Sequence, residues 1–370
     1  MAEMQGGNFS LFMYFAFWYL GNSFYNIQNK KALNATGGKT AGFGMTVATL
    51  QLGIGAIYSF VIWAVGYNFL PCVGVVAPTK QDPPKLRAKE IVAMLPVAFC
   101  SAAAHSASVL ALNAGSVTFG QIVKAGEPVF AAVVGTVIYG KSVSVAKWLC
   151  LPVIIGGVVF SCLKPGKVTG AYAIEYDMTA LAMASVANVF AAIKGAENGK
   201  LMKTEGLKEK IGGVGNQFAL TEVLGFFISL PVMLYLEGGN FFSFINMFMT
   251  DSLEKSSSVA GNKGPWPWSK ASTQVVSTVI EGTGLQYNLL ASGMTFYLYN
   301  ELATMTIKKT SPLAASVANT AKRVIVMLVS AVVFGEQLTF EKKLGAGIAI
   351  FGVFLYSVID DLLKPKSKTE

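Results

Sequence analysis

Three cations lie inside otherwise apolar segments, and their chemistry needs an explanation. Lys322 and Arg323 are adjacent in SVANTAKRVIVMLVSAVVFG (316–335), and Lys124 lies in FGQIVKAGEPVF (119–130). Arginine offers a planar fork of donors that suits phosphate, and lysine offers a compact point charge. A carboxylate alone would leave three such cations overcharged. The residues therefore predict a binding site for phosphate or a phosphorylated metabolite.

Other polar residues follow these cations at helical spacing. Gln121 and Glu127 are three residues from Lys124, and Asn319 is three residues from Lys322. Residues three or four apart share one face of a helix, so we expect these groups to support the cations. Two structural alternatives stay open: Lys124 could simply pair with Glu127, and the lone histidine, His105, could be a satisfied buried residue.

The composition indicates a membrane protein. Of the 370 residues, 53% are hydrophobic and 13% are charged, whereas a soluble domain has about 25% charged residues. The net charge of +9 does not indicate nucleic-acid binding, because most lysines fall in short clusters between apolar runs. We therefore expect the lipid bilayer as a partner, with no nucleic acid and no obligatory protein partner.

The apolar runs predict an all-α membrane protein with ten transmembrane helices, since a spanning helix needs about 20 mostly apolar residues. The predicted segments are 9–28, 41–65, 92–113, 118–139, 145–163, 174–193, 216–236, 278–303, 312–334 and 342–361. A charged link is expected at 194–213, and a long polar loop at about 238–275. We expect glycines such as Gly126 to let the fourth segment bend as the protein moves.

An internal repeat divides the chain into two five-helix units, 1–163 and 164–370. The stretch 133–160 aligns without gaps to 328–355, which places Gly140 on Gly335 and Gly157 on Gly352. Because five is odd, the two units would have opposite topology, as in many secondary transporters. In this alignment Lys124 falls on Asn319, one helical turn from Lys322. A central site built from both units is therefore expected near the middle of the bilayer.

Several kinds of chemistry are excluded by what the sequence lacks. Its cysteines form no CxxC pair, and one histidine with no Asp/Glu cluster offers no metal site. We expect no metal, no cofactor and no enzymatic activity, including activity on phospholipid. A channel is also disfavoured, because a midplane cluster that binds one anion tightly would slow conduction.

At these residues the chain resembles the plastid phosphate translocators of the drug/metabolite transporter superfamily, and most of all the triose-phosphate/phosphate type. The resemblance rests on FWYLGNSFYNIQNKK (17–31), FGQIVKAGEPVFAA (119–132), YLYNELA (297–303) and SPLAASVANTAKRVIVMLVSAVVFG (311–335). It implies ten helices in two inverted repeats, and exchange of inorganic phosphate for triose phosphate or 3-phosphoglycerate across the plastid inner envelope.

The resemblance also implies roles for individual residues. Phosphate would be bound by Lys124, Lys322, Arg323 and Ser108, and the organic part by His105 and Tyr299. Ser108 stands where the family has a threonine, and Ala187 stands where it has an arginine on the sixth helix. The missing arginine leaves open a phosphoenolpyruvate or sugar-phosphate/phosphate translocator. An endomembrane nucleotide-sugar transporter, which shares this architecture, is a further alternative.

Overall fold

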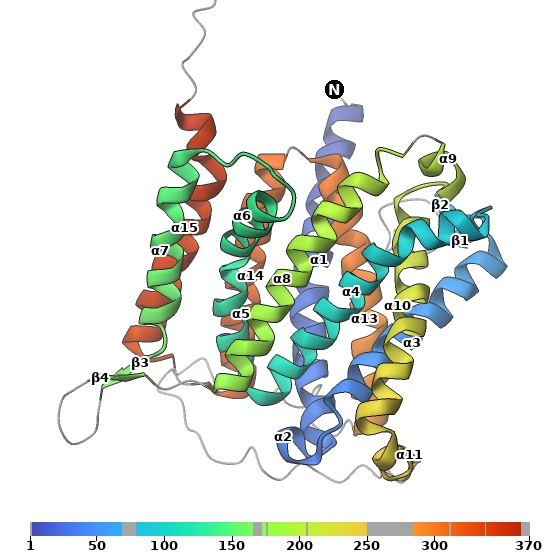
Figure 1. Cartoon of the computed structure of the whole chain (residues 1–370), viewed down its shortest axis with the longest axis horizontal. Coiled ribbons are helices and arrows are strands. Elements are labelled where there is room, and N and C mark those ends of the chain that lie inside the picture. The colour runs from blue at the N-terminus through green and yellow to red at the C-terminus, as the bar shows by residue number, and fades with distance from the viewer. Residues whose placement is uncertain are drawn as a thin grey trace, which may run out of the picture.

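The computed structural model describes residues 2–68, 79–165, 172–174, 177–204, 206–249, 284–310, 312–336 and 338–363. Almost all of this chain is helical, as the sequence predicted (Figure 1). Two short antiparallel strand pairs, β1–β2 and β3–β4, lie between helices. The elements are α1 (Ala2–Ala35), α2 (Gly38–Ala41), α3 (Gly44–Val65), β1 (Tyr67–Asn68), β2 (Thr79–Lys80), α4 (Ala88–Ala114), α5 (Val117–Ala125), α6 (Glu127–Val137), α7 (Val145–Phe160), β3 (Leu163–Pro165), β4 (Tyr172–Ile174), α8 (Met178–Leu201), α9 (Leu207–Ile211), α10 (Val214–Glu237), a 3-10 turn (Gly238–Asn240), α11 (Phe241–Met249), α13 (Leu285–Lys309), α14 (Pro312–Phe334) and α15 (Phe340–Leu363).

Six described helical spans are long and apolar enough to cross a membrane: α3, α4, α8, α10 with α11, α14 and α15. The bent pair α5–α6 makes a seventh if it is counted as one span, and α7 is apolar but shorter. Each of the ten predicted segments overlaps a helix, although 278–283 lies outside the described residues. Helices α1 and α13 are too polar to meet the same criterion. They pack against each other and bury polar side chains such as Asn26, Asn29 and Ser292. Asn29 accepts a hydrogen bond from the side chain of Gln51.

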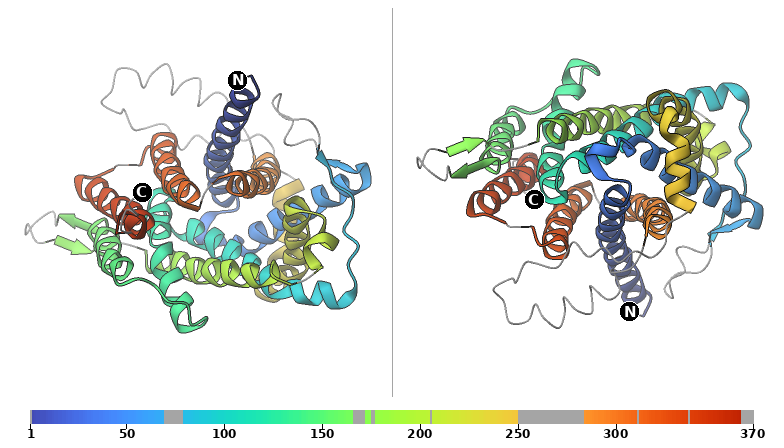
Figure 2. Two further views of the ribbon diagram at one scale, coloured as in Figure 1. Left: turned by 90° about the horizontal axis from the view of Figure 1, so that it is seen from above. Right: turned by 90° about the horizontal axis from the view of Figure 1, so that it is seen from below.

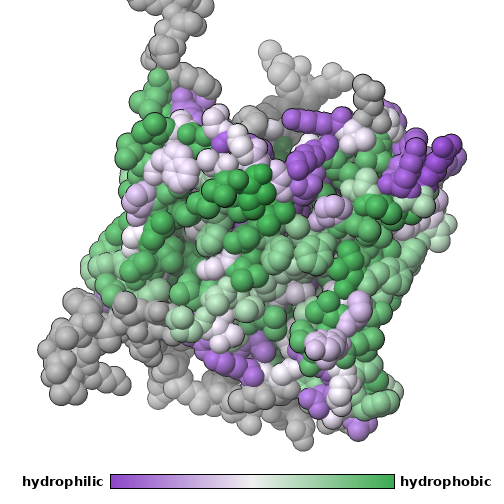
Figure 3. Space-filling model, in the orientation of Figure 1, coloured by the Kyte–Doolittle hydropathy of each residue, from purple (hydrophilic) through white to green (hydrophobic). Residues whose placement is uncertain are grey.

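The outer surface also fits a bilayer. Large apolar side chains such as Val137, Leu149 and Phe351 point outward, and each is at least 60% exposed. On the face shown in Figure 3, apolar residues cover the middle and hydrophilic residues gather at the two ends. A water-soluble monomer rarely exposes so large an apolar surface, whereas lipid tails favour it.

The helices pair across the two halves of the sequence. Helix α1 packs along α13, α4 packs along α8, and α5 contacts α14. Helix α3 packs on α10, and α7 packs on α15. Viewed from the end of the bundle, α7 and α15 lie at one edge and α3 and α10 lie toward the other (Figure 2). The space between these edges holds α1, α5, α13 and α14, which carry most of the predicted site.

The α7–α15 pair is closely packed through glycines. A Cβ on Gly157 would lie 2.4 Å from the backbone nitrogen of Ala349, and a Cβ on Gly345 would lie 2.4 Å from that of Ser161. Small residues let membrane helices approach until their backbones touch. Gly140 and Gly335, which the repeat aligns, both adopt positive φ (61° and 60°) just beyond α6 and α14.

The fourth predicted segment is broken. Helices α5 and α6 meet at Gly126 with a bend of 40°. Pro128 follows at once and has no backbone N–H to continue the helical ladder, which accounts for the break. The bend places Lys124 at the end of α5 and Glu127 at the start of α6.

Two predicted loops are partly helical. The first part of the expected link at 194–213 belongs to α8, which continues to Leu201, so Lys194 is a helical residue. The first part of the expected loop at 238–275 forms the 3-10 turn and α11, where Phe244 is buried against Phe43. An apolar run, FFSFINMFM, explains why this stretch packs and does not form a polar loop. Residues 250–283 lie outside the described chain.

Candidate functional site

The three predicted cations lie near one another in the folded chain. Lys124 is on α5 in the first half, and Lys322 and Arg323 are on α14 in the second half. Their charges interact with one another, so the three groups face a common region. Helices α5 and α14 are in direct contact, and this contact brings the two halves of the site together.

Arg323 has a partner, which is Glu127. Its guanidinium forms an ion pair with the Glu127 carboxylate across the α6–α14 boundary. The Arg323 side chain is largely buried, with 13% exposed, whereas Glu127 is 44% exposed. The sequence offered Glu127 as a partner for Lys124, and the structure pairs it with Arg323.

Lys124 and Lys322 have no hydrogen bond or ion pair with any residue that the structure describes. The ammonium of Lys322 lies 5.2 Å from the centre of the Trp18 ring on α1, which is a cation–π contact. Trp18 is 1% exposed, so its ring is held by packing on the side of this lysine that it contacts. An aromatic face attracts a cation without neutralising its charge, so Lys322 retains the capacity to bind an anion.

The residues expected to meet the organic part of a substrate form an aromatic cluster. His105 on α4 lies 4.0 Å, centre to centre, from the Phe296 ring on α13. Tyr299 packs edge-on against Phe296 at 5.9 Å, and lies 5.3 Å from Tyr25 on α1. Both His105 and Tyr299 are buried, and Nε2 of His105 has no hydrogen-bond partner in the described structure. The charge of Lys124 acts on His105, which links the cluster to the cations.

The remaining predicted residues have supporting positions. Ser108 donates to the carbonyl of Ala104 at 2.7 Å, one turn back on α4. Gln121 donates to the side chain of Asn26 at 3.2 Å, which connects α5 to α1. Asn319 is half-buried on α14.

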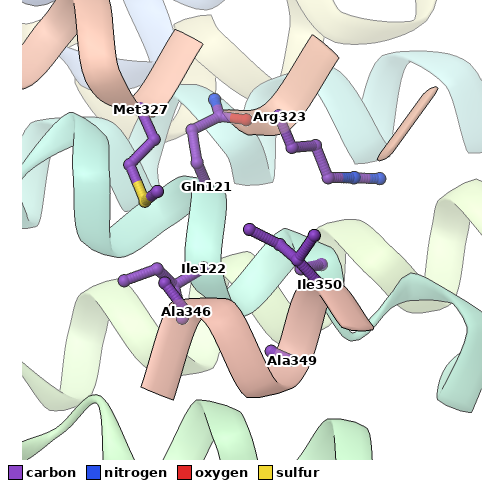
Figure 4. A pocket seen from close by; sticks show the side chains of 8 residues that line it. Gln121, Ile122, Arg323, Met327, Ala346, Ala349 and Ile350 are labelled. Carbon is purple, nitrogen blue, oxygen red and sulfur yellow. The ribbon is translucent and has the colours of Figure 1, made fainter. Parts of the chain in front are cut away.

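A small cavity lies beside Arg323, between α5, α14 and α15 (Figure 4). It has a volume of about 10 Å³, which is room for about one water molecule. Gln121 and Arg323 are its polar residues, and Ile122, Met327 and Ile350 make it mostly apolar. The cavity is too small for phosphate.

Sequence reasoning missed two residues near this site. Trp18 gave no signal, because a tryptophan in an apolar run is ordinary. Lys194 was assigned to a charged link, yet its charge acts on both His105 and Lys322. Lys194 lies seven residues beyond Ala187, hence about two turns along the same face of α8. Ala187 itself is buried, and its neighbour Asn188 donates to the carbonyl of Val123 on α5 at 3.1 Å.

The described residues contain no group of three or more His, Cys, Asp or Glu side chains that would hold a metal. Cys100, Cys150 and Cys162 are buried free thiols, and Cys72 lies outside the described chain. The arrangement is therefore a set of cations and hydrogen-bonding aromatic residues, which suits binding of an organic phosphate.

Comparison with known proteins agrees with this chemistry. Residues 9–357 match the Triose-phosphate Transporter family. The chain is 26% identical over 355 residues to the chloroplastic glucose-6-phosphate/phosphate translocator 2 of Arabidopsis thaliana, covering 96% of this chain and 76% of that protein. It is 28% identical over 342 residues to the chloroplastic triose phosphate/phosphate translocator of Brassica oleracea var. botrytis, covering 92% and 69%. It is 26% identical over 356 residues to the chloroplastic xylulose 5-phosphate/phosphate translocator of Arabidopsis thaliana, covering 96% and 71%.

These relatives differ in the sugar phosphate that their names give, but all are phosphate translocators. The match extends over nearly the whole chain and includes every helix that carries a predicted site residue. The chain therefore belongs to the Triose-phosphate Transporter family.

Proposed function

We propose that this protein is an antiporter that exchanges inorganic phosphate for triose phosphate or 3-phosphoglycerate. The observation that carries the proposal is the meeting of Lys124, Lys322 and Arg323 from opposite halves of the chain, with the charges of Lys124 and Lys322 unpaired in the described structure. His105 and Tyr299 lie next to these cations and would hydrogen-bond the organic end of the substrate. Ser108, Gln121 and Asn319 would support the phosphate subsite, and Glu127 would pair with Arg323 until phosphate binds.

The proposed architecture is ten transmembrane helices in two inverted five-helix repeats, 1–163 and 164–370. The packing supports it, because contacts recur in equivalent pairs. The α1–α13 contact is matched by α8–α4, and the α3–α13 contact is matched by α10–α4. The Gly157–Ala349 approach is matched by Gly352, whose Cβ would lie 3.1 Å from the backbone nitrogen of Ile154. Such matching is expected when two homologous units are related by a two-fold axis.

Charge explains why transport would be an exchange. Sealing an empty site that holds unpaired cations is costly, because burial removes their hydration. A doubly charged phosphate offsets most of that cost. The two halves would therefore close only around a bound anion. The binding site would then switch from one side of the membrane to the other only when it is loaded. Rocking of α5–α6 at its break would open the site to one side at a time.

A sugar-phosphate/phosphate exchange is the second candidate function. It is favoured by relatives whose names specify glucose-6-phosphate and xylulose 5-phosphate translocators, at the same level of identity as the triose phosphate relatives. The two functions differ in the space needed around His105 and Tyr299. Because the relatives named above are chloroplastic, we also propose the plastid inner envelope as the location of this chain.

Uptake of labelled phosphate into proteoliposomes tests the proposal. Vesicles are preloaded with phosphate, triose phosphate, 3-phosphoglycerate, phosphoenolpyruvate, glucose 6-phosphate or a nucleotide sugar, or are left empty. We expect uptake only into vesicles preloaded with inorganic phosphate or a phosphorylated metabolite other than the nucleotide sugar. Uptake should be fastest with the preferred counter-substrate. Equal uptake into empty vesicles would exclude obligate exchange, and activity with nucleotide sugar alone would exclude the phosphate-exchange function.

The Lys322→Ala variant tests the site itself. It should reduce exchange about tenfold or more, because a hydrogen bond to a charged group contributes about 1.5–3 kcal/mol. Lys200→Ala is the matched control, since Lys200 lies at the exposed end of α8 beside Glu197. Exchange near the wild-type rate in Lys322→Ala would show that phosphate binds elsewhere.

A further inference from the structure

A buried carboxylate lies in the bundle outside the phosphate site. Glu222 on α10 is 1% exposed, and its Oε2 has no hydrogen-bond partner in the described structure. No ion pair or hydrogen bond joins its side chain to any described residue. An ionised carboxylate that is removed from water without a partner is very unfavourable, so such a group is held as the neutral acid. In a membrane bundle, buried ionisable residues usually serve a function.

The surroundings of Glu222 make room for the acid but do not neutralise it. Gly55 on α3 faces it, and a Cβ there would lie 3.2 Å from Glu222 Oε2 and 3.3 Å from the Tyr297 ring. The glycine thus leaves the space that the carboxyl group fills. Tyr297 on α13 is fully buried and completes the enclosure.

The titratable and charged groups facing Glu222 come from three helices, and α4, which also packs on α10, carries His105. Tyr25 is on α1, and Tyr297 and Tyr299 are on α13; each interacts electrostatically with Glu222. Lys194 on α8 is the cation whose charge acts on it. The Lys194 charge also acts on His105 and Lys322. Glu222 is therefore linked to the phosphate site through Tyr299 and Lys194.

Glu222 also lies at the boundary that the transport cycle would change. Gly55 belongs to the first half of the chain, whereas Glu222 and Tyr297 belong to the second. On the exchange function proposed above, rocking of one half against the other would separate α3 from α10 and admit water to the carboxyl group. Glu301 lies one turn from Tyr297 on α13; it is also buried and accepts a hydrogen bond from Asn68 at 2.6 Å.

We propose that Glu222 is a proton-binding site of this transporter. Building on the exchange function proposed above, Glu222 carries a proton whenever the α3–α10–α13 region is closed. It releases that proton when the halves separate and water and Lys194 stabilise the anion, and it takes up one proton again before closure. The phosphate cycle is thereby coupled to the protonation of a side chain outside the phosphate site.

Infrared spectroscopy of the purified protein tests the protonation state directly. At neutral pH the wild-type protein should show a protonated carboxylic acid band that Glu222→Gln removes and Glu222→Asp shifts. Glu237→Gln is the matched control on the same helix. The Glu237 carboxylate accepts hydrogen bonds from the backbone N–H groups of Met45 and Thr46 at 2.8 and 2.6 Å, so unlike Glu222 it has partners. Its substitution should remove no acid band. Absence of a Glu222-dependent band overturns the proposal.

Exchange measured over a pH series, with equal pH on both sides, tests the role in transport. Titration of phosphate affects the wild type and Glu222→Gln equally, so the ratio of their rates isolates Glu222. Glutamine mimics the protonated acid, and the wild-type rate should therefore fall relative to Glu222→Gln as pH rises. A constant ratio would make Glu222 a structural acid only. If the wild type exchanges no phosphate, the exchange function fails, while the infrared measurement still determines whether Glu222 binds a proton.

Discussion

The carboxylate of Glu127 pairs with the guanidinium of Arg323, and this ion pair joins α6 in the first half of the chain to α14 in the second. If phosphate binds the three cations of the site, as proposed above, it would compete with Glu127 for Arg323. On the proposed function, the pair would hold the halves together when substrate is absent, and phosphate would displace Glu127 as it binds.

Removing Glu127 tests this competition. Glu127→Gln should lower the KM for phosphate by about 1.5- to 5-fold, because a half-exposed ion pair contributes about 0.2–1 kcal/mol. The measurement is the concentration dependence of phosphate exchange in proteoliposomes. Glu197→Gln, which breaks the Glu197–Lys200 pair at the end of α8, is the control and should leave KM unchanged. A raised KM in Glu127→Gln would mean that Glu127 orients Arg323 for phosphate.

Lys194 should contribute to selectivity among substrates. Its charge reaches His105, which is expected to face the organic part. Lys194→Ala should reduce kcat/KM for 3-phosphoglycerate about tenfold relative to its effect on phosphate, since a charged hydrogen bond is worth about 1.5 kcal/mol or more. Competition of each substrate against labelled phosphate provides the measurement. Equal losses for both substrates would assign Lys194 to the phosphate subsite.

The α7–α15 contact should be intolerant of a single methyl group. In Gly345→Ala the new Cβ would lie 2.4 Å from the Ser161 nitrogen and 2.6 Å from the Gly157 carbonyl oxygen. Overpacking of this kind costs about 1–3 kcal/mol. Gly347→Ala, two residues along, meets nothing within 4 Å and should be neutral. Thermal unfolding of the two variants in detergent distinguishes them, and equal midpoints would contradict the packing described.

Asp177 should stabilise the start of α8 in a pH-dependent way. Its carboxylate accepts from Lys39 Nζ at 2.5 Å and from the Ala180 N–H at 3.0 Å. Lys39, with the Ala180 N–H, holds the pKa of Asp177 below its usual range. A lowered pKa in the folded state adds stability above the ordinary pKa of aspartate, and this stability is lost as pH falls through the lowered value.

The variants Asp177→Ala and Asp177→Asn separate the two contributions. Asp177→Ala should cost about 0.5–2 kcal/mol at neutral pH, because the helix loses its N-cap. Asp177→Asn keeps a capping oxygen and loses only the contact with Lys39, so its cost should be smaller. Melting curves at neutral and acidic pH measure both. The difference between wild type and Asp177→Asn should vanish in acid, and a difference that persists there would rule out the ion-pair contribution.

The sequence by itself determined the features that depend on local pattern. Apolar runs of membrane length located the helices, and three cations within those runs identified the candidate site, because placing charge at membrane depth is unfavourable unless it has a use. Three-residue spacing predicted that Glu127, Gln121 and Asn319 accompany the cations, and these residues lie on α6, α5 and α14. The break at Pro128 also follows from local chemistry, since proline cannot continue the helical hydrogen bonds.

Only the tertiary structure decided which side chains meet. Trp18 lies beneath Lys322, Glu127 pairs with Arg323 and not with Lys124, and Gly55 makes room for Glu222, although each pair is far apart in the chain. Helical periodicity shows which residues share a face but not which helix that face contacts. Membrane helices make this harder, because lipid-facing and helix-facing positions are equally apolar and close packing is what selects the partner. The surroundings of the cations and of Glu222 therefore emerge only when distant helices are packed together.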